Sequence, residues 1–120
     1  DEVQVPLLVY WKDLPVGKQY GLSSHTDILP ALMRQIFHVE NRLMDYTQGS
    51  NLFDLSGRDW VQASNFNWNV IIQSDGTQYH INRKGNYKKF NPNYEEQSSD
   101  RPPLGLFLET FQLENQFFEK

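Results

Sequence analysis

The stretch around Asp75-Gly76 constrains the fold more than any other part of the chain. Apolar residues alternate with other residues on both sides of this pair: Phe66, Trp68, Val70 and Ile72 before it, and Tyr79 and Ile81 after it. Period-two alternation is typical of strands that are covered on one face. An Asp-Gly pair between two such runs predicts a β-hairpin closed by a two-residue turn. That turn also fixes the expected cross-strand pairs, which are Ile72 with Tyr79, Val70 with Ile81, and Trp68 with Arg83.

Two further elements are expected before the hairpin. Residues 3 to 12 alternate apolar and other side chains, which predicts a strand, and Pro6 places it at a sheet edge because proline has no N–H to donate. Thr26 can cap a helix and Gly49 can end it, so we expect a helix of about 22 residues between them. Its apolar stripe consists of Leu29, Leu32, Met33, Ile36, Val39 and Leu43. Glu40 interrupts that stripe.

Shorter strands are expected elsewhere in the chain. Residues 51 to 64 indicate a loop that leads into a strand, and residues 87 to 90 indicate a short strand after a turn at Gly85. Alternating leucines predict another strand from Leu104, while residues 109 to 120 fit either a continued strand or a short helix. The expected fold class is α+β, with one long helix packed on a mostly antiparallel sheet of about four to six strands.

Length and composition limit the possible organisation. The 120 residues suit a single globular domain spanning 1–120, and aromatic residues make up 14% of the chain. The chain has no cysteine, which excludes disulfides, thiol nucleophiles and cysteine zinc sites, and tilts the expectation towards a reducing compartment such as the cytoplasm. No apolar run is long enough to cross a membrane. Whether the chain is a whole protein, a processed product or an excised domain stays open, as does its oligomeric state.

The motifs of catalysis and cofactor binding are missing. The sequence has neither a phosphate-binding glycine loop nor a nucleophile elbow, and its histidines, His25, His38 and His80, do not have the spacing of metal ligands. We therefore expect no cofactor, no metal and no enzyme activity. A third-ranked hypothesis remains a small enzyme that uses Glu40, because a carboxyl group buried in an apolar stripe could act as a general acid or base.

The segment 79–90 is the strongest candidate for a binding surface. It carries +4 and no acidic residue, so the rest of the chain, at a total of -4, carries -8. Cations interleaved with aromatic side chains suit either an acidic or phosphorylated protein partner or, as the alternative, a nucleic acid. A solvated hairpin end that balances the acidic remainder is also open. The candidate binding residues are Arg83, Lys84, Tyr87, Lys88, Lys89 and Phe90.

Aromatic residues at the C-terminal end form the second candidate surface. Phe117 and Phe118 either fold back onto the core or dock into a partner. The amide-rich face of the hairpin near Trp60 and Tyr87 could alternatively bind a sugar. Taken together, the sequence favours a non-catalytic protein–protein interaction module, of the adaptor, inhibitor or immunity, or subunit type.

Overall fold

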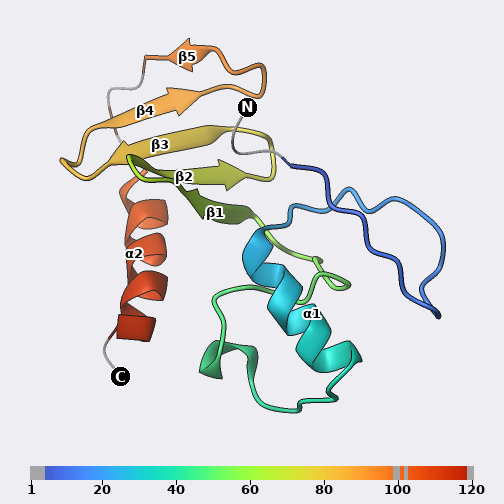
Figure 1. Ribbon diagram of the computed structural model, residues 1–120. Coiled ribbons are helices and arrows are strands. Elements are labelled where there is room, and N and C mark those ends of the chain that lie inside the picture. Colours follow the sequence, from blue (N-terminus) through green and yellow to red (C-terminus); the bar gives the residue numbers. More distant parts are fainter. Residues whose placement is uncertain (1–4, 99–100, 102, 119–120) are drawn as a thin grey trace.

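The computed structural model describes residues 5–98, 101 and 103–118. Five strands form one antiparallel sheet in the order β1-β2-β3-β4-β5. Figure 1 shows the helices below this sheet. The expected α+β class with a mostly antiparallel sheet is confirmed. The strands are β1 (Trp60–Ser64), β2 (Trp68–Gln73), β3 (Gln78–Asn82), β4 (Tyr87–Phe90) and β5 (Glu96–Gln97). The helices are the 3-10 helices η1 (His25–Asp27) and η2 (Leu43–Asp45), and α1 (Ile28–Gln35) and α2 (Leu104–Phe118).

Three successive hairpins are closed by loops of the same kind. Gly76, Gly85 and Tyr94 follow one another at intervals of nine residues, and each takes a left-handed φ, of 86°, 83° and 63°. In each loop the N–H of this residue donates to the carbonyl three positions earlier, at 2.9 to 3.0 Å. The loops therefore hold three residues each, the type that ends in a left-handed residue. Glycine takes that φ without steric cost, whereas Tyr94 does so as a side-chain-bearing residue.

The hairpin at Asp75-Gly76 forms, but the expected register is wrong by one residue. Ile72 pairs with Gln78, Ile71 with Tyr79 and Val70 with His80. The N–H of Gln73 donates to the carbonyl of Thr77 at 2.8 Å, so Ser74 belongs to the loop. The N–H of Ser74 instead donates to the carbonyl of Asp59 at 2.8 Å, just before β1. A contact with a third strand thus selects the three-residue loop, and the shift moves Ile71 onto the face of Tyr79 and Ile81.

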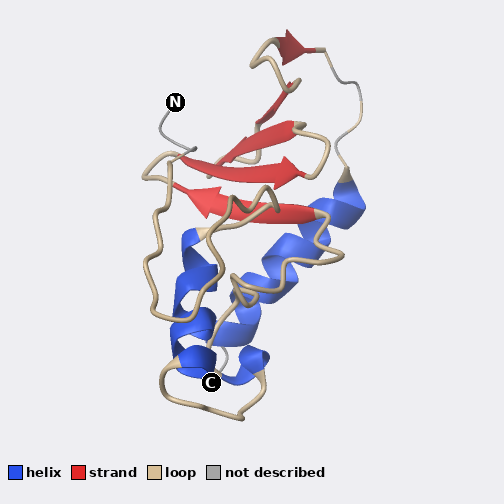
Figure 2. Cartoon of the chain, turned by 90° about the vertical axis from the view of Figure 1, so that its right-hand side faces the viewer, coloured by secondary structure: helices blue, strands red, loops and turns tan. Residues whose placement is uncertain are grey.

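The core lies between α2 and one face of the sheet. Ile71, Tyr79 and Ile81 form its buried centre, and Leu106 and Phe107 of α2 pack against them. The Phe107 ring meets the rings of Tyr79 and Tyr87 edge to face, at centroid distances of 6.1 and 6.0 Å. Edge-to-face pairs add to the energy of apolar burial. Figure 2 shows the helices α1 and α2 on the same side of the strands.

The long helix of the fold is α2, which begins where a strand was expected from Leu104 and continues through the residues from 109 for which a short helix was one of the two alternatives. The inward side chains of α2 recur at helical spacing, and Thr110 among them is buried. The Phe107 N–H donates to the carbonyl of Pro103 at 3.1 Å, so the helix begins directly after the Pro102-Pro103 pair. Leu104, Leu106 and Leu108 alternate, but in α2 only Leu106 packs on the core, whereas Leu104 and Leu108 are exposed. Short apolar runs do not distinguish the two structures.

The helix expected from Thr26 to Gly49 is much shorter. Ser24 caps η1, with the side chain of Asp27 closing the capping box, and α1 ends at Gln35. His38 then takes a left-handed φ of 51°, and the Val39 N–H donates to the carbonyl of Met33 at 3.0 Å. A left-handed residue ends a helix. Because this position is not occupied by glycine, the helix end could not be predicted from the sequence pattern.

The strand expected at residues 3–12 is absent from the part of it that the structure describes. Residues 5–20, here called the arm, belong to no helix and no strand. Figure 1 shows the arm (blue) leading away from the sheet and turning back before the chain enters α1. The strand prediction is therefore wrong for residues 5–12, which pair with no neighbouring strand among the described residues.

Candidate interaction surfaces

The arm exposes an unusual amount of apolar surface. Leu8 and Tyr10 are both 94% exposed. Eight large apolar side chains of this segment are exposed: Val5, Leu7, Leu8, Val9, Tyr10, Trp11, Val16 and Tyr20. Single exposed apolar residues are ordinary, but a group of this size within residues 5–20 makes the arm a candidate interaction surface.

Exposure along the first part of the arm alternates with period two. The odd-numbered Val5, Leu7, Val9 and Trp11 are 42 to 57% exposed, whereas the even-numbered Leu8 and Tyr10 are almost fully exposed. Successive side chains of an extended chain point to opposite sides, so two faces are defined. One face of residues 5–11 is partly covered, and the other is fully open to solvent.

Helix α1 adds a second group of exposed apolar side chains. Leu29, Leu32 and Ile36, which belong to the stripe expected to be buried, are exposed, as are Phe37 and Met44. Only Pro30 and Ala31 of α1 are buried. The amphipathic pattern of this helix is therefore real, but its apolar side is not fully covered by the described residues.

One buried ion pair attaches this part of the chain to the sheet. The Asp27 carboxylate is fully buried and accepts from the N–H groups of Ser24 and Ser50, at 2.6 and 2.7 Å. The Arg58 guanidinium pairs with it and also donates to the carbonyl of Trp60 at 3.3 Å. A buried carboxylate needs such partners, because removing its charge from water is costly. Arg58 thereby ties the start of α1 to β1.

The basic segment 79–90 does not form a single surface. Tyr87 and Lys89 lie on the α2 side of the sheet, where Tyr87 packs on Phe107 and Lys89 Nζ lies 6.0 Å from the centroid of the Tyr79 ring. Lys88 and Phe90 point to the opposite side, since neighbours in a strand alternate. The expected candidate residues are therefore divided between two faces.

The remaining contacts of these residues are mostly internal. Lys88 Nζ pairs with Glu96 at 2.9 Å, and the Phe90 ring lies 4.6 Å from the His80 ring. Arg83 and Lys84 lie in the loop between β3 and β4, and the Arg83 guanidinium stacks over the Phe66 ring at 5.4 Å. Phe117 and Phe118 occupy the last turn of α2, and their side chains lie outside the described residues.

A shallow groove lies at the tips of the hairpins. Its volume is about 400 Å³, and it combines two aromatic side chains, two cations and three amides. Its lining residues are Phe66, Asn67, Trp68, Asn82, Arg83, Lys84 and Asn86. The side-chain oxygen of Asn82 already accepts from the N–H groups of Lys84 and Asn86, so this amide holds the turn. Of the expected binding residues, the groove contains Arg83 and Lys84, beside the aromatic side chains of Phe66 and Trp68.

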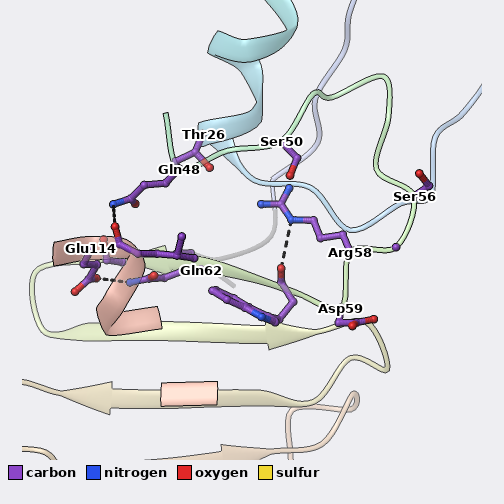
Figure 3. A pocket seen from close by; sticks show the side chains of 13 residues that line it. Thr26, Gln48, Ser50, Ser56, Arg58, Asp59, Gln62 and Glu114 are labelled. Carbon is purple, nitrogen blue, oxygen red and sulfur yellow. Dashed lines mark hydrogen bonds between the residues drawn. The ribbon is translucent and has the colours of Figure 1, made fainter. Parts of the chain in front are cut away.

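A polar cleft of about 450 Å³ lies between β1, α2 and residues 48–59. Figure 3 shows the Gln62 amide donating to the Glu114 carboxylate, and the Gln48 amide donating to the carbonyl of Leu113. Arg58 lines the cleft, but its charge is matched by Asp27, whereas the Asp59 and Glu114 carboxylates remain. The cleft is therefore a poor site for an anion. Its hydrogen bonds connect α2 to β1 and to Gln48.

Two titratable groups have shifted pKa values. Burial lowers the pKa of His80, and the neighbouring Lys88 cation lowers it further. The Thr77 N–H, which donates to Asp75 Oδ1 at 2.8 Å, holds the pKa of that carboxyl below its ordinary value. Asp75 therefore acts as a turn residue, and His80 belongs to an aromatic row with Trp68 and Phe90.

The structure does not provide the catalytic arrangement that was considered for Glu40. This residue lies beyond the end of α1 and is exposed, so the apolar burial on which the hypothesis depended is not found. Among residues 5–98, 101 and 103–118, His, Asp and Glu side chains form no cluster that could hold a metal ion. Nor does any helix in this part of the chain have the length and apolar character needed to cross a membrane.

Comparison with known proteins finds relatives that are longer than this chain. An uncharacterized protein of Haemophilus influenzae (strain Rd) is 77% identical over 120 residues, which are all of this chain and 20% of that protein. The inner membrane protein YejM of Salmonella typhimurium is 29% identical over 116 residues, which are 96% of this chain and 20% of YejM. YejM of Salmonella typhi matches equally well. The chain thus spans about a fifth of the length of these relatives, and no protein-family profile matches it.

The arm is the candidate surface that sequence reasoning missed. Its alternation was interpreted as an edge strand of this domain. The signal that could have identified it is the even-numbered face, where Leu8 and Tyr10 are apolar as well. An edge strand of a small sheet usually has one polar face, and two apolar faces indicate cover on both sides.

Proposed function

We propose that this chain is a non-catalytic interaction domain of a longer polypeptide, and that its arm docks onto another protein surface. The observation that carries the proposal is the group of exposed apolar side chains at residues 5–20. Exposed apolar area of this kind is costly in water and is normally buried in a protein contact.

The length of the relatives supports the same function. The matched region is a fifth of the Haemophilus influenzae protein and a fifth of YejM, so in both a large part of the polypeptide is available to cover such a surface. The name of YejM places that relative in the inner membrane. Transferred to this chain, the name suggests a domain of a membrane-associated protein.

The basic segment is a less favoured docking surface. Tyr87 packs in the core, Lys88 pairs with Glu96, and Arg83 stacks on Phe66, so several of its groups have partners within the domain. The same division between two sheet faces weakens the nucleic-acid alternative. Stacked bases need aromatic side chains on one continuous surface.

The first test is the size of the native protein. An antibody against this chain should detect, in cells of its source, a band at about five times the 14.2 kDa of the chain. A band at 14.2 kDa would contradict the proposal that the domain belongs to a longer polypeptide.

The second test uses the arm itself. In the longer protein, the double variant Leu8→Ser and Tyr10→Ser should cost about 2–4 kcal/mol of unfolding free energy, because two apolar anchors lose their cover. The double variant Leu104→Ser and Leu108→Ser is the matched control, since both side chains are also exposed but lie on α2. Equal effects of the arm and control variants in thermal unfolding would refute docking through the arm.

A further inference from the structure

We infer that residues 5–11 form an edge strand of a β-sheet contributed by the remaining part of the longer polypeptide. This inference rests on the proposed function and names both the partner and the mode of binding. It begins from two observations: residues 5–11 belong to no helix or strand of the described chain, and their side-chain exposure alternates with period two.

The backbone of the arm requires hydrogen-bond partners once its side chains are buried. Every N–H and C=O removed from water must be paired, or the contact loses stability. A lipid surface offers few such partners to an extended chain, and membrane-surface segments are usually helical for that reason. The edge of a sheet offers a continuous row of them, and an extended segment that adds to an edge is a common mode of recognition.

Pro6 determines which side of the strand is paired. The N–H and C=O groups of alternate residues in a strand point to opposite edges. Pro6 has no N–H, so the even-numbered residues are suited to the unpaired edge. The odd-numbered residues Val5, Leu7, Val9 and Trp11 then carry the N–H and C=O groups that join the neighbouring strand.

The side chains add an independent requirement. Leu8 and Tyr10 are fully open on one face of the arm, while the odd-numbered side chains are already partly covered. The neighbouring part of the polypeptide must therefore supply an apolar layer over Leu8 and Tyr10. Both faces of the strand would then be covered, which agrees with its apolar character on both sides.

The rest of the same polypeptide is favoured over a separate partner because it is covalently attached. The relatives carry about four times as much chain outside the matched region as within it. A tethered partner acts at an effective concentration on the order of millimolar, which exceeds that of most free proteins. The strand needs no high intrinsic affinity in that case.

The test is amide hydrogen exchange at single-residue resolution on the whole longer polypeptide, with the 120-residue chain as reference. Against the isolated chain, the amides of Leu7, Val9 and Trp11 should exchange on the order of 100-fold more slowly, while those of Leu8 and Tyr10 should change much less. Equal protection of both sets, protection of the even set alone, or no protection would each overturn the one-sided edge strand.

Proline substitutions provide a matched check of the paired side. Leu7→Pro removes a pairing N–H, so the Val9 amide should exchange on the order of tenfold faster than in Leu7→Ala. Leu8→Pro removes an N–H on the open edge and should differ little from Leu8→Ala. Equal effects of the two prolines, each relative to its alanine, would overturn the assigned parity.

Photocrosslinking from positions 8 and 10 separates failure of this inference from failure of the proposed function. Crosslinks to the remaining part of the same polypeptide support both the inference and the proposed function. Crosslinks to a different protein or to a second copy would overturn the inference but leave docking through the arm standing. The absence of any protein crosslink, together with fast exchange throughout the arm, would overturn both.

Discussion

Arg58 pairs with Asp27 across 31 positions of sequence, and the Asp27 carboxylate at the centre of this contact is fully buried. The Arg58 side chain is only 15% exposed. This pair joins the start of α1 to β1, and it acts together with the bond from the Ser50 N–H to the Asp27 carboxylate. Because Asp27 neutralises the Arg58 guanidinium, Arg58 offers no unpaired positive charge to the cleft that it lines.

Removing Arg58 should therefore destabilise the fold. Arg58→Ala leaves a buried carboxylate without its cation, and we expect a loss of about 3–5 kcal/mol in unfolding free energy. Urea denaturation followed by circular dichroism measures it. The control is Arg42→Ala, which breaks the exposed 3.7 Å pair with Asp45 and should change stability by less than about 1 kcal/mol. A loss at Arg58 no larger than at Arg42 would mean that Asp27 is solvated in solution.

Shortening an apolar side chain should destabilise the isolated chain strongly in the buried sheet face and only slightly in the arm. Ile71 is completely buried in the isolated chain, and Ile71→Ala should cost about 2–5 kcal/mol because it leaves a cavity. Leu8→Ala in the same isolated chain should change stability by no more than about 0.5 kcal/mol, since Leu8 is open to solvent. Chemical denaturation of both variants is the measurement. A large effect at Leu8 would show that the arm packs on its own domain.

Substitution at Gly85, in the loop between β3 and β4, should act through backbone conformation and not through packing. At Gly85, φ is +83° and no atom lies within 4 Å of an added Cβ, so Gly85→Ala should cost about 1–2 kcal/mol through strain alone. Gly105, in the first turn of α2, also has open space, and Gly105→Ala should stabilise the chain by up to about 1 kcal/mol. The midpoint temperature of thermal unfolding should fall in Gly85→Ala and rise in Gly105→Ala. A change in the same direction in both variants would contradict the assigned loop conformation.

Stability should decrease as the pH falls below the ordinary range of histidine. The pKa of His80 is lowered in the folded state, so the unfolded chain, with a pKa of about 6.5, takes up the proton first. The stabilising effect of neutral His80 is fully present above about pH 6.5 and is lost as the pH falls towards its folded-state pKa. Unfolding free energies measured from pH 7.5 to 5 should show the decrease.

Two variants test whether His80 causes this decrease in unfolding free energy. His80→Gln removes the titrating group and should flatten the decrease, while Lys88→Gln removes the second cause of the shift and should reduce it in part. An unchanged profile in His80→Gln would assign the decrease to other groups.

The strands were predictable because their signals are local. Alternation at residues 68–73 and the glycines at 76 and 85 indicated β2, β3 and β4 correctly, since turn residues and side-chain period act within a few positions. The nine-residue interval between the left-handed positions was not recognised, because its third member is Tyr94 and not glycine. The interaction residues expected at 79–90 were found on two faces, because alternation divides any run along a strand.

The sequence by itself determined the α+β class, the hairpins and the absence of disulfides, because composition and short-range pattern are enough for these. Only the tertiary structure decided the register, the helix boundaries and the arm. The register depends on the bond from Ser74 to Asp59, and the end of α1 depends on a left-handed histidine. The openness of the arm depends on which strands lie beside it. Each of these is a contact between distant residues or a backbone state that residue type does not specify, and local pattern therefore cannot encode it.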